Sequence, residues 1–187
     1  ENIENIGNIE NISTIKGSIQ KEQQTNFFKT LALQNISFDI KTSGGGSIRQ
    51  LSIQPKGLEI DNQNIALEID GEVVNAEIAD LNSDGFPEIL IYTMSAGSGS
   101  YGNVIGYSVN NGKSISEIYF PEISENKVAS NGYMGHDEFS IVGNSLVRRF
   151  PLYQSGDVNA APTGGTRKLV YKLLDTGSGW ALRWSAL

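Results

Sequence analysis

Four oxygen-bearing side chains lie close together in the stretch DLNSDGFPE, at a spacing that could bind a hard cation. Asp80, Asn82 and Asp84 alternate along the chain, Gly85 follows them, and Glu88 comes four residues after Asp84. Oxygen ligands on a turning loop can converge on Ca²⁺, and the glycine permits the tight reversal that calcium loops need. A plain turn between strands favours the same residue types for backbone reasons. The turn is the preferred interpretation and calcium binding is the alternative, because the stretch lacks the last carboxylate of an EF-hand.

The single histidine, His136, lacks a nucleophile that it could activate. The chain has no cysteine, and no serine lies in a Gly-x-Ser-x-Gly elbow between a strand and a helix. The adjacent carboxylates Asp137 and Glu138 would face opposite sides of a strand, so they cannot form a local glycosidase pair. We therefore expect that the protein is not an enzyme and that His136 is a loop residue hydrogen-bonded to its neighbours.

Two adjacent arginines, Arg148 and Arg149, stand in the strand-like run LVRRFPLY. Neighbouring residues of a strand face opposite ways, so one of the two points out of the sheet. A solvated salt bridge is the preferred interpretation. An arginine that faces a partner is the alternative.

The stretch SAGSGSYGN, residues 95–103, is rich in glycine and hydroxyl groups and holds one large ring, Tyr101. It directly follows Glu88–Met94, the most apolar strand-like run in the chain. A glycine-rich hairpin whose tyrosine packs back on the domain would account for it. The other interpretation is an exposed binding loop anchored by a core strand.

The elements that must position these groups are short strands. From Phe27 onward, apolar residues alternate with polar ones, and no segment holds a helical stripe for three turns. This pattern predicts an all-β fold, an antiparallel β-sandwich of two packed sheets with about 8–10 strands. Four turn signals predict hairpins: Asp70-Gly71, Asn110-Asn-Gly-Lys113, Gly143-Asn144 and Asp175-Thr-Gly-Ser-Gly179.

Two regions of different composition divide the chain. Residues 1–25 repeat Glu-Asn-Ile or a close variant, and such low-complexity sequence cannot bury much on its own. We interpret residues 1–25 as a linker or accessory segment and residues 26–187 as a single β-sandwich domain.

The charge balance excludes some classes of partner. Acidic residues outnumber basic ones 21 to 14, giving a net charge of −7. A nucleic-acid binder needs a basic face, so we expect no nucleic acid and instead a basic protein partner. No apolar run is long enough for a spanning helix, so we expect no membrane insertion.

Much of the chain resembles a known family. The stretch AEIADLNSDGFPEILIYTMSAGSGSYGNVIGYSVNNGKS, followed by YMGHDEF, LVRRFPLY and APTGGTRKLVYKL, is similar to the periplasmic inhibitors of invertebrate-type (I-type) lysozyme from Gram-negative bacteria. The resemblance covers about residues 65–184. Its functional motif, Ser-Gly-x-Tyr, corresponds to Ser98, Gly99, Ser100 and Tyr101, and a second functional loop is placed around Tyr153, Thr163 and Gly164.

The resemblance implies an inhibitor of lysozyme, periplasmic or secreted, that acts in bacterial defence against a host. Its loop would enter the substrate cleft of the lysozyme partner. There a serine hydroxyl such as that of Ser98 can donate to an ionised carboxylate and accept from a protonated one, and Tyr101 can fill a sugar subsite. No cofactor is required beyond the possible Ca²⁺, and a homodimer is left open. The alternative function is a calcium-dependent extracytoplasmic binding or adhesion module that uses the Asp80–Glu88 loop.

Overall fold

Strands make up most of the part of the chain that the structure describes. The computed structural model describes residues 27–184, so the predicted linker over residues 1–25 lies outside it. Twelve strands and two short helices follow one another in this range: β1 (Phe28–Leu33), β2 (Ile36–Ser43), β3 (Ile48–Lys56), β4 (Ile65–Asp70), β5 (Glu72–Ala79), β6 (Glu88–Met94), β7 (Gly102–Asn110), β8 (Ser114–Tyr119), η1 (Ile123–Glu125), α1 (Lys127–Ser130), β9 (Glu138–Val142), β10 (Ser145–Pro151), β11 (Thr166–Asp175) and β12 (Trp180–Trp184).

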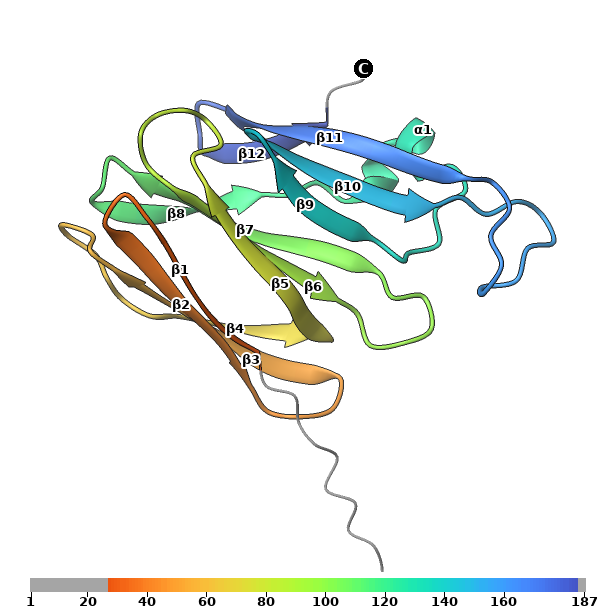
Figure 1. Cartoon of the computed structure of the whole chain (residues 1–187), viewed down its shortest axis with the longest axis horizontal. Helices are drawn as coiled ribbons and strands as arrows, with labels where there is room; N and C mark the ends of the chain where they lie inside the picture. The colour runs from red at the N-terminus through yellow and green to blue at the C-terminus, as the bar shows by residue number, and fades with distance from the viewer. Residues whose placement is uncertain (1–26, 185–187) are drawn as a thin grey trace, which may run out of the picture.

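The strands form two sheets (Figure 1). The smaller sheet has the order β1-β2-β3-β4, and the larger has the order β5-β6-β7-β8-β12-β11-β10-β9. All neighbours are antiparallel except β8 and β12, which pair in parallel over only two residue pairs. The all-β class and the mostly antiparallel pairing are therefore confirmed, whereas the predicted count of 8–10 strands is too low.

Three of the four predicted hairpins are confirmed, and the first is wrong. The turns after β7, β9 and β11 each join antiparallel neighbours. At Asp70-Gly71 the chain instead leaves β4 in the smaller sheet and enters β5 in the larger one. Gly71 has φ +92°, and a side chain there would overlap the Met94 carbonyl oxygen. Glycine is therefore required at this position even though the chain crosses between sheets here and forms no hairpin.

The larger sheet has an apolar cluster on each face. One cluster lies between it and the smaller sheet, and contains Phe38, Ile53, Ile89 and Ile91 among others. The second lies inside the curve of the larger sheet, where strands β6 and β7 face β10, β11 and β12. Strand β6 contributes alternate side chains to both clusters, so Glu88–Thr93 is buried along both faces. The predicted core strand is thus a rigid support for the loop that follows it.

The curved larger sheet nearly closes on itself, so the predicted β-sandwich of two packed sheets is not confirmed. Its two outer strands, β5 and β9, meet at Glu77, whose Oε2 accepts hydrogen bonds from the Ile141 N–H at 2.9 Å and the Tyr92 hydroxyl at 2.6 Å. Burial and the adjacent carboxylate hold the pKa of Tyr92 far above its usual range, so this hydroxyl remains a donor. One carboxylate therefore joins the two edges that backbone pairing leaves apart.

Among the described residues, no helix has the length and apolar character to cross a bilayer.

We expect Glu77→Ala to lower the free energy of unfolding by about 2–4 kcal/mol, because it leaves two partly buried donors without an acceptor. Glu77→Gln, which keeps one acceptor oxygen, should lose clearly less. Urea unfolding of both variants followed by tryptophan fluorescence measures the difference. Equal losses would show that the charge, rather than the acceptor, closes the sheet.

Candidate functional site

The glycine- and serine-rich loop between β6 and β7 lies at the same end of the molecule as the long loop between β10 and β11 (Figure 1). We call residues 95–101 the probe loop. Two further segments contact it, residues 131–137 before β9 and residues 152–165 after β10. The candidate site is built from these three segments.

The probe loop is closed by its own hydrogen bonds. The Ser95 N–H donates to the Tyr101 carbonyl at 2.9 Å, and the Tyr101 N–H donates to Ser95 Oγ at 3.0 Å. The Tyr101 ring is 49% exposed and lies edge-on to Tyr133, with ring centroids 5.8 Å apart. The Ser98 side chain is exposed, and its hydroxyl forms no hydrogen bond with any described residue. The loop thus presents one free hydroxyl and one half-exposed ring.

The segment before β9 holds the probe loop through hydrogen bonds to its backbone. The His136 N–H donates to the carbonyls of Gly99 at 3.2 Å and Ser100 at 3.0 Å. Gly135 approaches so closely that a side chain there would overlap the Gly99 carbonyl oxygen. His136 itself has φ +60°, a strained conformation that this packing must hold in place. The segment therefore determines the path of the loop through backbone contacts.

The long loop after β10 also holds the probe loop, through the side chain of Asn159. Asn159 Nδ2 donates to the Ser98 carbonyl at 2.6 Å, and Asn159 Oδ1 lies 3.1 Å from His136 Nε2. The Tyr153 hydroxyl donates to the Asn159 carbonyl at 2.8 Å, and its ring stacks on His136. The expectation of a hydrogen-bonded loop histidine is confirmed. Asn159, absent from the predicted site, is the side chain that joins the two loops.

A buried ion pair lies beneath these segments. Arg148 Nε and Asp137 Oδ1 are 2.6 Å apart, and their side chains are 3% and 0% exposed. Asp137 Oδ2 also accepts hydrogen bonds from the Gly102 N–H at 2.7 Å and from the Tyr133 hydroxyl at 2.6 Å. Because Gly102 is the first residue after the probe loop, the ion pair anchors the loop to β10. The expectation of a solvated salt bridge at these arginines was wrong: Arg148 is buried and paired, and Arg149 is exposed.

Aromatic rings enclose the Arg148 guanidinium. Four ring centroids lie 5.0–5.7 Å from its central carbon, those of Phe120, Tyr133, Phe139 and Phe150. Ring faces attract a cation and replace part of its lost hydration. Burial and the hydrogen bond to Asp137 raise the pKa of Tyr133 above its usual range, so its hydroxyl stays a neutral donor. Each buried charge of the pair thus has its counter-ion, hydrogen-bond partners and, for Arg148, ring contacts, as an interior charge requires.

The three residues predicted for a second functional loop lie in the segment after β10, and their contacts are within that segment or, for Tyr153, also with residues 131–137. Tyr153 is 9% exposed, and the Gly164 N–H donates to the Leu152 carbonyl. Thr163 bonds through its N–H and hydroxyl to Asp157, whose pKa is lowered by the Gln154 and Thr163 N–H groups. Their role toward a partner stays a prediction. The structure shows them shaping the loop that carries Asn159.

The Asp80–Glu88 stretch forms a tight turn whose carboxylates accept from its own backbone. Asp80 accepts the N–H groups of Asp84 at 3.1 Å and Gly85 at 3.0 Å, and Asp84 accepts that of Phe86 at 2.8 Å. Over residues 27–184, no group of three or more Asp, Glu, His or Cys side chains is placed to hold a metal ion. Calcium binding by Asp80, Asn82, Asp84 and Glu88 stays a prediction.

Glu88 points into the protein rather than toward the turn's surface. It is fully buried, and its carboxylate accepts from the Leu81 N–H at 2.7 Å and the Ser108 hydroxyl at 2.8 Å. Burial raises its pKa from 4.5 to about 7, against these two hydrogen bonds. The carboxyl group therefore changes charge near neutral pH at the start of the strand that carries the probe loop.

Comparison with known proteins gives one match. The family model described as periplasmic lysozyme inhibitor of I-type lysozyme matches residues 61–130. This range contains the whole probe loop, and ends just before the segment that supports it. A search of the curated proteins and a search of the solved structures each found no match. The resemblance to this inhibitor family is thereby confirmed over residues 61–130.

We expect Arg148→Met to lower the free energy of unfolding by about 3–5 kcal/mol, because it leaves the Asp137 carboxylate buried without its counter-ion. The matched control is Arg149→Met at the exposed neighbouring position, which should change it by no more than about 0.5 kcal/mol. Chemical unfolding at neutral pH measures both. A similar small change in the two variants would contradict the role given to the ion pair.

The raised pKa of Glu88 predicts a pH-dependent stability. The native protein holds this proton more tightly than the unfolded chain, so the contribution is fully present below pH 4.5 and is lost as the pH rises through about 7. We expect the melting temperature to fall between about pH 5 and about pH 8. Glu88→Gln cannot ionise and should fall less over the same range. Parallel pH profiles for the two proteins would contradict the assignment.

Proposed function

We propose that this protein inhibits lysozyme, most directly the I-type enzyme, by inserting residues 98–101 into the substrate cleft. The family match supports lysozyme inhibition at the level of the family. The observation that carries the proposal for this loop is its combination of exposure and support. Ser98 and Tyr101 are presented outward while the backbone between them is hydrogen-bonded to two other segments.

The chemistry of a lysozyme cleft suits these two side chains. The enzyme uses two carboxyl groups, one protonated and one ionised, on either side of the scissile bond. The free Ser98 hydroxyl can donate to the ionised carboxylate and accept from the protonated acid. Tyr101 offers an apolar ring with a polar tip, which suits a subsite that otherwise binds a sugar.

The supporting segments reduce the cost of binding. A free glycine-rich loop would lose much conformational entropy when held in a cleft. Here the bonds from His136 and Asn159 order the backbone before the partner arrives. The ordering cost is therefore met on folding, and more of the contact energy remains for affinity.

A periplasmic location in a Gram-negative bacterium follows from the same family resemblance, as does a role as inhibitor rather than enzyme. Self-association into a homodimer stays a prediction. The predicted loop contacts of Tyr153, Thr163 and Gly164 would act beside the probe loop in this proposal, at the rim of the same cleft.

We expect Ser98→Ala and Tyr101→Ala each to weaken binding to I-type lysozyme by about 1–4 kcal/mol, as truncation of central interface residues does. Their melting temperatures should stay close to that of the unaltered protein, because both side chains are exposed. Inhibition of cell-wall hydrolysis and calorimetric titration measure the effect.

The matched control is Tyr119→Ala, because Tyr119 is 50% exposed and lies outside the three loop segments. It should inhibit like the unaltered protein. Full inhibition by both loop variants would remove the probe loop from the mechanism. Failure of the unaltered protein to inhibit any I-type enzyme would remove the function itself.

A further inference from the structure

Two exposed apolar side chains lie in the segments that support the probe loop, one in each segment. Met134, in the segment before β9, is 43% exposed. Val158, in the long loop after β10, is 65% exposed. Apolar surface that stays in water gains nothing from folding. The exposed parts of these two side chains therefore do not serve the core of the protein.

Backbone and ring contacts place Met134 next to the probe loop. The residue after it, Gly135, lies so close to the Gly99 carbonyl that a side chain there would overlap it. The residue before it, Tyr133, has its ring centroid 5.8 Å from that of Tyr101. Met134 thus lies between two residues that both contact the probe loop.

Val158 begins the turn at the end of the long loop. The Ala161 N–H donates to the Val158 carbonyl at 2.9 Å, which closes this turn. Asn159, the next residue, donates to the Ser98 carbonyl at 2.6 Å and so holds the turn against the probe loop. Residues 158–162 are all exposed and carry no charge. An ordered, neutral turn therefore lies directly beside the exposed Ser98.

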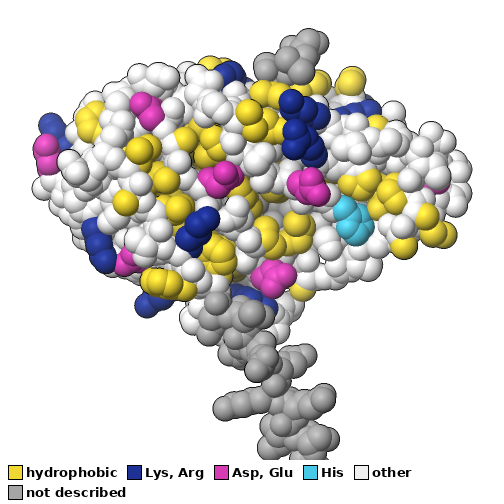
Figure 2. All heavy atoms as spheres, in the orientation of Figure 1, with side chains coloured by type: hydrophobic (Ala, Val, Ile, Leu, Met, Phe, Trp, Pro, Cys, Tyr) yellow, Lys and Arg dark blue, Asp and Glu magenta, His cyan; other side chains and the backbone are white. Residues whose placement is uncertain are grey.

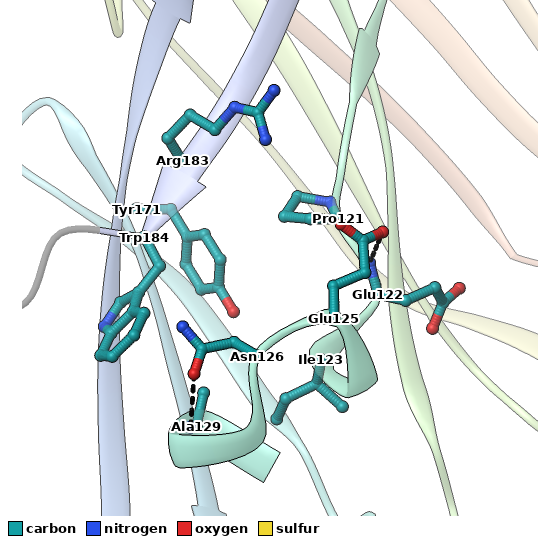
Figure 3. Close-up of a pocket in the computed structure, with 9 residues that line it drawn as sticks. All are labelled: Pro121, Glu122, Ile123, Glu125, Asn126, Ala129, Tyr171, Arg183 and Trp184. Atoms are coloured by element: carbon teal, nitrogen blue, oxygen red, sulfur yellow. Dashed lines mark hydrogen bonds between the residues drawn. The ribbon is translucent and has the colours of Figure 1, made fainter.

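Apolar residues on the two short helices are buried instead. Ile123 and Ala129 are 9% and 3% exposed and belong to the apolar cluster inside the larger sheet. They line a pocket together with Tyr171 and Trp184 (Figure 3). At the surface, Figure 2 shows apolar side chains beside the chain's single histidine, His136, whose N–H supports the probe loop. Burial serves the fold at the helices, whereas the apolar groups around the probe loop stay open to a partner.

The probe loop is too small to form a specific interface by itself. Stable protein complexes bury about 800 Å² on each partner, contributed by roughly 20–30 residues. A partner that receives residues 98–101 must therefore also cover the segments beside them. Tyrosine and methionine are both enriched in such interfaces, and the flexible methionine side chain adapts to the shape of an apolar neighbour.

We propose that Met134 and Val158 form an apolar contact with the lip of the lysozyme cleft that receives Ser98 and Tyr101. The proposal rests on the inhibitory function proposed above and adds a second contact to it. The surface that they meet on the enzyme is apolar and uncharged, because residues 158–162 offer no charge with which to pair. Removal of apolar surface from water drives this contact, and salt screening of exposed charges leaves it unchanged.

The test compares two double variants of the full chain that remove similar apolar side chains. The contact variant is Met134→Ser, Val158→Ser. The control variant is Leu174→Ser, Val142→Ser, at positions that are 49% and 57% exposed. Both control positions lie at the ends of β11 and β9 that are opposite to the supporting segments. Binding to I-type lysozyme is measured by titration calorimetry at several temperatures and at two salt concentrations.

We expect the contact variant to bind about 10-fold more weakly, by the same factor at both salt concentrations. Its heat-capacity change on binding should be less negative, because less apolar surface is buried in the complex. The control variant should bind like the unaltered protein. The melting temperature of the contact variant should stay close to that of the unaltered protein, because both side chains are exposed.

Unchanged affinity of the contact variant would overturn the proposal. An equal loss in the control variant would overturn it as well, and so would a loss with an unchanged heat-capacity change. Failure of the inhibitory function itself looks different. In that case the unaltered protein would not bind lysozyme, whereas failure of this contact alone leaves its binding intact and still weakened by Tyr101→Ala.

Discussion

The ion pair between Arg148 and Asp137 is the interaction on which the candidate site depends. It joins β10 to the segment before β9 and, through the Gly102 N–H, to the first residue after the probe loop. A buried charge is tolerated only when every hydrogen-bonding position and its counter-charge are provided. That requirement brings four aromatic rings to one point, among them that of Tyr133, whose hydroxyl also bonds to Asp137. It fixes the relative positions of three segments that are far apart in the chain.

A rigid support and an exposed tip are combined at this end of the molecule. Strand β6 is buried on both faces, so the residue that begins the probe loop cannot shift without disturbing two apolar clusters. The loop itself is open at Ser98 and Tyr101 and held at its backbone by His136 and Asn159. A loop whose backbone is held in this way would lose little conformational freedom on binding.

The surface charge is mixed, and the family match covers only part of the candidate site. The surface seen in Figure 2 carries acidic and basic side chains interspersed among apolar ones, without a continuous basic patch. The matched family range, residues 61–130, includes all of the probe loop. The supporting residues of the later segments lie beyond that range.

The sequence by itself determined the all-β class, three hairpins and the probe loop, because alternation, turn residues and a glycine-rich stretch after an apolar run are local signals. Only the tertiary structure decided that the larger sheet curls and is closed by Glu77, that the Asp70-Gly71 turn changes sheets, and that Arg148 is buried. Nothing near Arg148, Asp137 or Asn159 in the chain distinguishes them from ordinary surface residues. Their roles come from contacts between positions from 11 to 61 residues apart, which arise only when the strands have paired and the interior has excluded water.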